Sequence, residues 1–179
     1  MTDDIAAAAC SYVQHGWKVI QLHDVTNRGT CSCHEGPACA SAGKHPIAKA
    51  WQLSFLETPG EVMSAWAARP SANVGIVTGP PSGIFVLDVD PLHDGPAKLA
   101  ELQRVNGPLP PTYTVQTGSG GWHLYFSLHN VDFEVTNSRG SLPLGLDIRG
   151  RGGFVVAPPS ISSRGRYTVA NGIPVAAFG

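Results

Sequence analysis

The sequence predicts an α+β protein in which helices lie on one face of a mainly antiparallel or mixed sheet. Three observations indicate this fold class. Two helical patterns precede the strands, a third interrupts them, and the strands themselves are short and apolar. The 21 Gly and 15 Pro among 179 residues predict frequent turns between these elements. A hydrophobic content of 42% is typical of a globular chain, with room for one domain or one two-lobed domain.

Two helices are expected in the first part of the chain. Residues 5–15 are rich in helix-forming side chains, and Gly16 follows them as a stop signal. A second helix is expected from the sequence at 58–61, Thr-Pro-Gly-Glu, to a point before Pro70. Thr and Glu three positions apart form a capping box, and Pro is favoured at the first helical position. The expected inward face of this second helix carries Val62, Met63, Trp66 and Ala67.

The strands follow from alternating or continuous apolar runs between turn residues. One is expected at 17–22, before an aperiodic segment at 23–46 that is rich in Cys, His and Gly. A third helix is expected at about 96–105, with Leu99, Leu102 and Val105 facing inward. The other strands are expected at 73–78, 84–90, 112–117, 122–128, 146–149, 154–157 and 167–169.

The charge pattern is uneven, although the net charge is only −1. From residue 139 onward the chain carries five Arg and no Lys against one acid, Asp147. Arginine favours planar recognition of phosphate or carboxylate groups, and ordinary surface charge is the alternative interpretation. The five are Arg139, Arg149, Arg151, Arg164 and Arg166.

No apolar segment approaches the roughly 18 residues that a membrane-spanning helix needs. The N-terminal sequence at 1–4 is acidic, which is unlike a secretory signal peptide. We therefore expect a soluble, cytoplasmic protein without a membrane partner.

Three carboxylates are candidate ligands for a divalent metal ion. Asp88 and Asp90 end the apolar run at 84–87, and residues two apart on a strand point to the same face. Two carboxylates so close repel one another unless a cation lies between them, and oxygen ligands suit Mg²⁺ or Mn²⁺. Asp147 lies on another short strand, before Arg149. The alternatives are a strand end that enters solvent at Pro91 and a structural Asp147–Arg149 ion pair.

A glycine-rich turn at 118–121 leads into the strand that carries His123. Its backbone N–H groups could hold an anion. His123 and Tyr125 are expected on one face of the strand, with His123 on the more polar face near the turn. A histidine at this position is a candidate for phosphate binding, and a purely structural role is the alternative.

The aperiodic segment at 23–46 contains the pattern C-x-C-x5-C-x5-H, formed by Cys31, Cys33, Cys39 and His45. Three cysteines so close together in a chain that we expect to be cytoplasmic favour a metal site over disulfides. Three thiolates and one imidazole suit tetrahedral Zn²⁺ in a closed structural site. His34 competes with His45 as the fourth ligand, but a ligand adjacent to Cys33 would strain the chelate.

The order of these motifs resembles the archaeo-eukaryotic primase superfamily. The closest resemblance is to the bifunctional DNA primase/polymerase (prim-pol) N-terminal domain of plasmid and phage replication proteins. It rests on Val-Leu-Asp-Val-Asp at 86–90, Gly-Ser-Gly-Gly-x-His at 118–123 and Gly-x-Asp-x-Arg-Gly at 145–150. The cysteine loop, the segment 73–79 and the segment 152–160 extend the resemblance over nearly the whole chain.

The resemblance implies a primase-polymerase core formed by a single domain over 1–179. An N-terminal αβ lobe of about 1–70 would carry the zinc loop, and an RRM-like sheet of about 71–179 would carry the motifs. Asp88, Asp90 and Asp147 would hold the catalytic Mg²⁺ or Mn²⁺, and His123 would contact the phosphates of the incoming nucleotide. The second motif of the family is often Ser-x-His, whereas this chain has Gly121 and its nearest hydroxyl is that of Ser119. Arg149 and Arg151 are expected to hold triphosphate or template backbone.

The implied function is template-directed nucleotidyl transfer by two metal ions in phage or plasmid DNA replication. Single-stranded DNA template, primer and dNTP or rNTP would be the substrates. Such domains commonly precede a helicase, so a helicase domain is an expected partner. A two-metal nuclease and a non-catalytic, zinc-containing nucleic-acid-binding module are the alternatives.

Overall fold

The computed structural model describes residues 4–138 and 140–178. It contains two compact units, which are described separately. The first unit contains the chain up to Val77 together with Val155–Thr168. The second contains Thr78–Phe154 and the chain from Val169 onward. The fold class is α+β, as predicted, with three α-helices and mainly antiparallel sheets.

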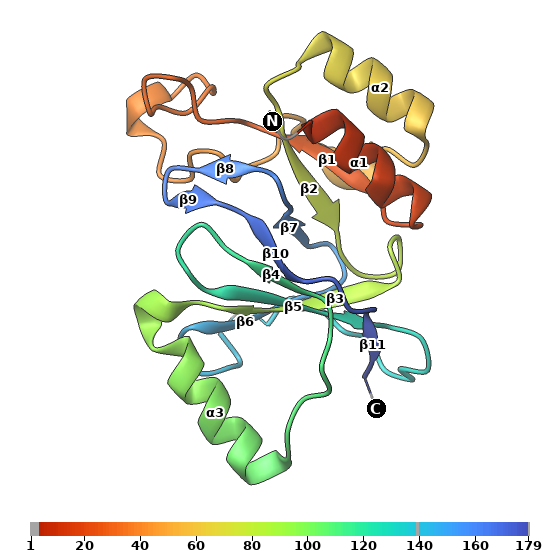
Figure 1. Cartoon of the computed structure of the whole chain (residues 1–179), viewed down its shortest axis with the longest axis vertical. Coiled ribbons are helices and arrows are strands. Elements are labelled where there is room, and N and C mark those ends of the chain that lie inside the picture. Colours follow the sequence, from red (N-terminus) through yellow and green to blue (C-terminus); the bar gives the residue numbers. More distant parts are fainter. Residues whose placement is uncertain (1–3, 139, 179) are drawn as a thin grey trace. The chain divides into compact units, whose positions relative to one another are not determined.

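The first unit combines two helices with a small sheet of order β1-β2-β7 (Figure 1). Its helices α1 (Ile5–Gln14) and α2 (Pro59–Ala68) pack against each other. Strand β1 (Val19–Leu22) runs antiparallel to β2 (Asn73–Val77), and β7 (Phe154–Val156) completes the sheet. Every residue of β2 is buried, which agrees with the run of residues without polar side chains that follows Asn73.

The long connection after β1 contains little regular structure. Short 3₁₀ turns occur at Gly36–Ala38 and Trp51–Leu53. A two-stranded hairpin, β8 (Ile161–Ser162) and β9 (Gly165–Arg166), also belongs to this unit. The sequence pattern did not predict this hairpin, because strands of two residues show no periodicity.

The second unit is built on a six-stranded sheet whose main path is β10-β4-β5-β3-β6. The central strand β3 (Ile84–Val89) is antiparallel to both β5 (Trp122–Ser127) and β6 (Leu146–Arg149). Strands β4 (Thr114–Gln116) and β10 (Thr168–Asn171) extend the sheet beyond β5. The short β11 (Ala176–Ala177) pairs in parallel with the end of β5.

One face of this sheet forms the hydrophobic core of the second unit. The helix α3 (Gly95–Asn106), which follows the 3₁₀ turn η3 (Pro91–His93), packs against β3 and β6. It contributes Leu99 and Leu102 to the core. The buried residues at its centre are Phe85, Leu87, Val89, Phe126 and Leu146.

Two expected helix faces are partly wrong. In α2, Val62 and Trp66 are buried, but Met63 is 56% exposed and Ala67 is also exposed. Val62 and Trp66 lie about one turn apart and form the inward face. Met63 and Ala67 each come one residue later, so the helix rotates them by about 100° away from that face. In α3, Val105 is 66% exposed, so the last turn of that helix does not reach the core.

Within the described residues, no helix combines the length and apolar character that crossing a membrane requires.

The predicted capping box at the start of α2 is present. Thr58 accepts a hydrogen bond from the Glu61 N–H at 3.3 Å, and the Glu61 carboxylate accepts from the Thr58 N–H at 2.9 Å. The Glu57 N–H also donates to this carboxylate. The backbone donors of Glu57 and Thr58 and the Thr58 hydroxyl lower the pKa of Glu61 below its ordinary value.

We expect this cap to weaken in acid. A depressed carboxyl pKa contributes stability that is present above the unfolded-state pKa and lost as the pH falls through the folded-state pKa. Glu61→Gln should therefore lower the melting temperature more at pH 7 than at pH 3. The exposed loop carboxylate of Asp132 provides the matched control, Asp132→Asn. An equal effect of Glu61→Gln at both pH values would contradict the assignment.

Candidate active site and metal centre

The register of three strands brings together three of the predicted site residues. Asp88 on β3 lies opposite His123 on β5 and opposite Asp147 on β6. Residues directly opposite in antiparallel strands project from the same face of the sheet. Asp147, Asp88 and His123 therefore form a row across the second unit, on the face opposite the hydrophobic core.

Burial differs along this row. His123 is only 5% exposed, and its Nε2 lies 3.7 Å from Asp88 Oδ1. The side chains of Asp88 and Asp147 are 30% and 46% exposed. A solute can thus reach both carboxylates, while the imidazole is enclosed beside Asp88.

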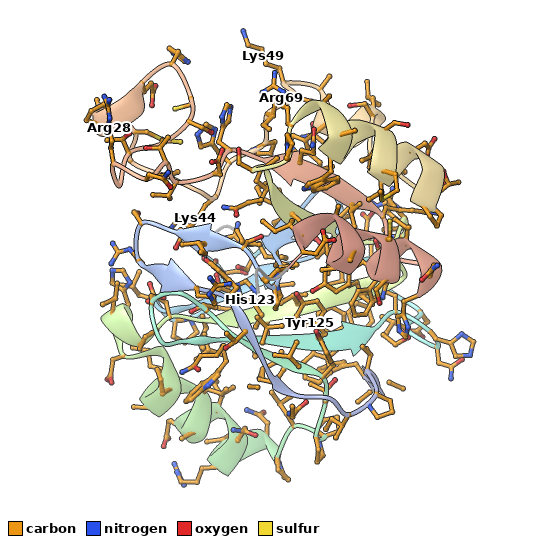
Figure 2. The ribbon with its side chains drawn as sticks, turned by 45° about the horizontal axis from the view of Figure 1, so that its top comes forward. Arg28, Lys44, Lys49, Arg69, His123 and Tyr125 are labelled. Carbon is orange, nitrogen blue, oxygen red and sulfur yellow. The ribbon has the colours of Figure 1, made fainter. Side chains whose placement is uncertain are left out.

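His123 lies on the face of β5 that also carries the carboxylate row, but its side chain is buried there. His123 and Tyr125 do share a face of β5 (Figure 2), but both are buried. Trp122, expected on the apolar face, is 37% exposed. His123 lies between Asp88 and Val115 of the neighbouring strands, whereas Trp122 is the first residue of β5.

Asp90 has a different local role from Asp88. It precedes η3, and its Oδ1 accepts a hydrogen bond from the Leu92 N–H at 3.0 Å. Its Oδ2 lies 2.9 Å from His93 Nδ1. Among the residues that the structure describes, the carboxylates of Asp88, Asp90 and Asp147 are not close enough together to form a group of three metal ligands.

The donor set nevertheless fits a hard divalent cation in part. Asp88 and Asp147 face each other across neighbouring strands, are half exposed and offer carboxylate oxygens, the ligands that Mg²⁺ and Mn²⁺ prefer. For Asp90 to join them, its carboxylate has to exchange the His93 contact for the ion.

Ser138 is a residue of this site that the sequence analysis missed. Its hydroxyl donates to Asp147 Oδ1 at 2.7 Å and accepts from the Ile148 N–H at 3.0 Å. The Ser138 N–H donates to the Ile148 carbonyl at 3.1 Å, which holds the two segments together. The hydroxyl therefore fixes the orientation of the Asp147 carboxylate. A serine in a polar loop, nine positions before the carboxylate, carries no local pattern that predicts this contact.

The two arginines after Asp147 are in different environments. Arg149 Nη2 lies 3.5 Å from Asp147 Oδ2, as in the structural ion pair considered as an alternative. Arg149 also shares a strand face with Asp147, since the two are two residues apart on β6. Arg151 lies beyond the end of β6 and pairs with Glu134. Arg139 lies outside the described residues.

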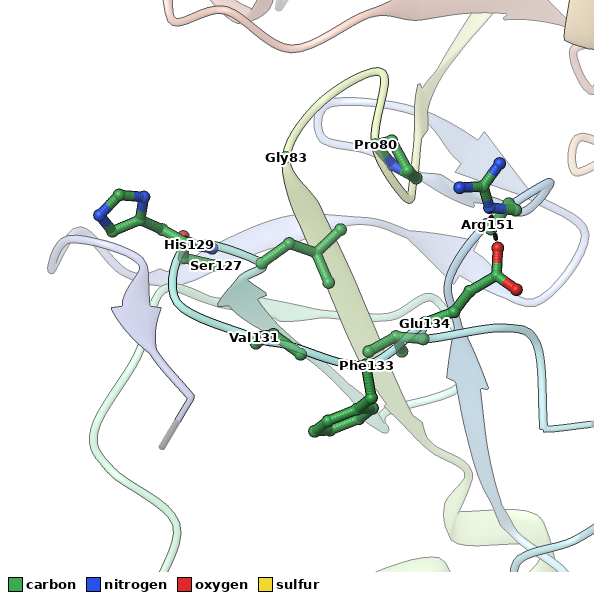
Figure 3. A pocket seen from close by; sticks show the side chains of 10 residues that line it. Pro80, Gly83, Ser127, His129, Val131, Phe133, Glu134 and Arg151 are labelled. Carbon is green, nitrogen blue, oxygen red and sulfur yellow. Dashed lines mark hydrogen bonds and ion pairs between the residues drawn. The ribbon is translucent and has the colours of Figure 1, made fainter.

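Arg151 lines a separate open cavity of about 550 Å³ (Figure 3). The Glu134–Arg151 pair lies at one side of this cavity, and His129, Val131 and Phe133 come from the loop after β5. The cavity does not include Asp88, His123 or Asp147 among its lining residues.

The glycine-rich turn is largely occupied by its own hydrogen bonds. The Gly120 N–H donates to the Thr117 carbonyl, and the Gly121 N–H donates to Thr117 Oγ1. Ser119 Oγ lies 3.1 Å from the same Thr117 hydroxyl. These two N–H groups of the turn are therefore engaged within it, which leaves those of Gly118 and Ser119 as the candidates for an anion. A Cβ at Gly121 would collide with the Val89 carbonyl, so this fold leaves no room for the serine of a Ser-x-His motif.

In the first unit, the cysteine loop forms a compact group of potential metal ligands. Ligand atoms of Cys31, Cys33, Cys39 and His45 all lie within 4.8 Å of one another. His45 Nε2 is 3.4 Å from Cys31 Sγ and 3.5 Å from Cys39 Sγ. His34 is exposed and does not belong to the group. The structure thus supports His45 over His34 as the fourth ligand.

The thiols differ in their proton affinity. Burial acts to raise the pKa of Cys33, but hydrogen bonds from Cys31 and from the backbone of Glu35 and Gly36 outweigh it and lower that pKa. Burial raises the pKa of Cys39 to about 11. Binding of a metal to this group therefore requires proton release, above all from Cys39.

Asn73 anchors the cysteine loop from the start of β2. Its buried side-chain amide donates to the carbonyls of Gly43 at 2.9 Å and Ile161 at 2.7 Å, and accepts from the Ile161 N–H. Gly43 has a φ of +81°, and a Cβ there would collide with the Ile161 carbonyl. The His23 ring stacks on His45 at a centroid distance of 4.6 Å. These contacts connect the segments on either side of His45 to β2, to the β8–β9 hairpin and to His23.

The fold and these two groups of residues define an α+β protein with carboxylates on facing strands and an additional Cys₃His loop. The family described as "Bifunctional DNA primase/polymerase, N-terminal" (Prim-Pol) matches residues 9–178. The chain belongs to this family, as the motif resemblance predicted. Membership implies a role in DNA replication with primase and polymerase activity, and hence DNA and nucleotides as substrates. A comparison with curated proteins gave no match.

The geometry of the cysteine loop predicts which histidine binds metal. His45→Ala should remove one of four ligands and strongly weaken binding of Co²⁺, whereas His34→Ala should not. The visible absorption of tetrahedral Co²⁺ during a titration measures both. Equal loss in the two variants, or loss only in His34→Ala, would overturn the assignment of His45.

Proposed function

We propose that this protein catalyses template-directed nucleotidyl transfer with two divalent metal ions, acting as a DNA primase and DNA polymerase. Family membership and the facing positions of Asp88 and Asp147 beside His123 support this proposal. The last observation carries most weight, because two accessible carboxylates on one face are the arrangement that in-line displacement with bound cations needs.

Asp88 and Asp147 would hold Mg²⁺ or Mn²⁺, joined by Asp90 after it leaves His93. When bound, the ions lower the pKa of the attacking 3′-hydroxyl and neutralise the charge of the triphosphate and of the leaving pyrophosphate. In the reaction, the 3′-oxygen bonds to the α-phosphorus, the bond to pyrophosphate breaks and the hydroxyl proton passes to solvent.

The remaining residues would bind and orient the nucleotide. Enclosure of His123 beside Asp88 supports a fixed imidazole that donates to a phosphate oxygen. Arg149, about 40% exposed, would exchange its contact with Asp147 for a phosphate once that carboxylate binds metal. Arg151 and Ser119 stay proposed nucleotide-binding residues, and each would first have to leave its present partner, Glu134 or Thr117.

We propose Zn²⁺ as the ion of the Cys₃His group, with a structural role. Three thiolates and one imidazole fill the four positions of a tetrahedral zinc ion and leave none for water or substrate. The proposed substrates are single-stranded DNA template, primer and dNTP or rNTP. The proposed setting is phage or plasmid replication in the host cytoplasm, in company with a helicase.

The central test is primer extension by carboxylate variants. Asp88→Asn and Asp147→Asn should each lower extension at least about a hundredfold, because a metal ligand is lost. Asp132→Asn, a loop carboxylate in the same unit, should retain it. Denaturing gels separate extended primers from shortened ones, so a nuclease would be recognised because it only shortens the primer. Metal-dependent extension also excludes a module that only binds nucleic acid.

Full extension by both carboxylate variants would overturn the proposed site. Electron paramagnetic resonance of bound Mn²⁺ provides a readout that does not depend on activity. It should show weaker Mn²⁺ binding in Asp88→Asn and Asp147→Asn, and unchanged binding in the control Asp132→Asn.

Ser138 provides a second test of the same site. Ser138→Ala should weaken Mn²⁺ binding and lower kcat by about 10- to 100-fold, the usual effect of removing a group that orients a metal ligand. Ser138→Thr keeps a hydroxyl and should restore part of the loss. The matched control is Ser141→Ala, an exposed serine in the same loop. Unchanged Mn²⁺ affinity in Ser138→Ala, with an unchanged melting temperature, would exclude a positioning role.

A further inference from the structure

Five basic side chains of the first unit form no ion pair with any carboxylate in the described part of the chain. The second unit is different. There, Arg104, Arg149 and Arg151 pair with acids, and Lys98 donates to the carbonyls of His93 and Leu144. The five unpaired residues are Arg28, Lys44, Lys49, Arg69 and Arg164, which we call the basic surface.

The basic surface surrounds the cysteine loop. Arg28 lies in the turn closed by Thr26 and Thr30, just before the first cysteine. Lys44 immediately precedes His45, and Lys49 follows a few residues later. Figure 2 shows these three with Arg69 on the segments that form and adjoin the loop.

The other two members come from elements that the fold brings to the loop. Arg69 is the C-cap residue directly after α2. Arg164 lies between β8 and β9, and the neighbouring Ser163 N–H donates to the Ala42 carbonyl of the loop at 3.2 Å. All but Lys44 are exposed, and Lys44 is half-buried.

The net charge around the cysteine loop is positive. Asp24 and Glu35 are the acids on the same loop. A zinc ion held by three thiolates and a neutral imidazole adds one net negative charge. The five cations therefore outnumber the negative charges around them, and without carboxylate partners they keep their full attraction for an external anion.

We propose that the basic surface binds the sugar–phosphate backbone of single-stranded nucleic acid without sequence preference. This inference rests on the proposed function, which makes a polynucleotide strand the substrate. Repeated phosphates are the chemistry that several separate cations recognise together, and binding gains from the release of condensed counterions. The three arginines can each form paired hydrogen bonds to a phosphate, while the lysines act as point charges.

The test is equilibrium binding of a fluorescein-labelled oligothymidylate by anisotropy, without nucleotide or divalent metal, over a series of NaCl concentrations. In the triple variant Arg28→Gln/Lys49→Gln/Arg164→Gln, binding should weaken. The slope of log K against log salt should fall by about 2 units, at about 0.7 for each lost phosphate contact with a single strand. Zinc content and melting temperature check that the variant is folded.

The matched control is Arg104→Gln, which removes an exposed, ion-paired arginine of the second unit and should leave the slope unchanged. An unchanged slope and affinity in the folded triple variant would overturn the proposal. So would binding of the wild-type protein to anionic phosphatidylserine vesicles, lost in the triple variant, without binding to the oligonucleotide.

Primer extension at saturating template separates this inference from the proposed function. If the triple variant binds the strand normally and wild-type protein extends primers, the proposed role of the basic surface is contradicted and the proposed function is supported. If wild-type protein binds the strand through these residues but extends no primer, the proposed role of the basic surface is supported and the proposed function is contradicted.

Discussion

The candidate active site depends on the hydrogen-bond register of β3 against β5 and β6. Because side chains alternate between the two faces of a strand, a shift of one residue would move Asp88 into the hydrophobic core and Leu87 or Val89 out of it. The register is therefore tied to core packing. The same ladder that buries Leu87, Val89 and Leu146 sets Asp88 opposite Asp147 and His123. The strand register that stabilises the core therefore also fixes the geometry of the site.

Positions beyond the regular strands need additional contacts to hold their side chains. Ser138 orients Asp147 from a loop, and Asp90 is turned toward the η3 backbone and His93. In the first unit, Asn73 performs a comparable task, since one buried amide links β2 to the cysteine loop and to the β8–β9 hairpin. Each of these polar groups is satisfied by hydrogen bonds, as burial or close packing requires.

The two units differ in how they use charge. In the second unit, each described arginine or lysine is engaged by a carboxylate or a carbonyl, and the carboxylates of the row remain partly accessible. In the first unit, Asp4 and Glu61 serve helix starts and Glu57 pairs with Lys18, while the five cations of the basic surface pair with no carboxylate that the structure describes.

The sequence by itself determined the features that depend on neighbouring residues. The capping box of Thr58 and Glu61 and the alternation along β3 and β5 follow from spacings of a few positions, and the structure agrees with them. The spacing of the cysteine loop favoured His45 without deciding between His45 and His34, and the geometry of the group supports His45. The order of motifs also indicated the Prim-Pol family, which matches residues 9–178. Only the tertiary structure revealed the burial of His123, the contact of Ser138 with Asp147 and the return of Val155–Thr168 to the first unit. These depend on strand register, on close backbone approach and on hydrogen bonds between separate segments, which leave no periodic pattern in the sequence.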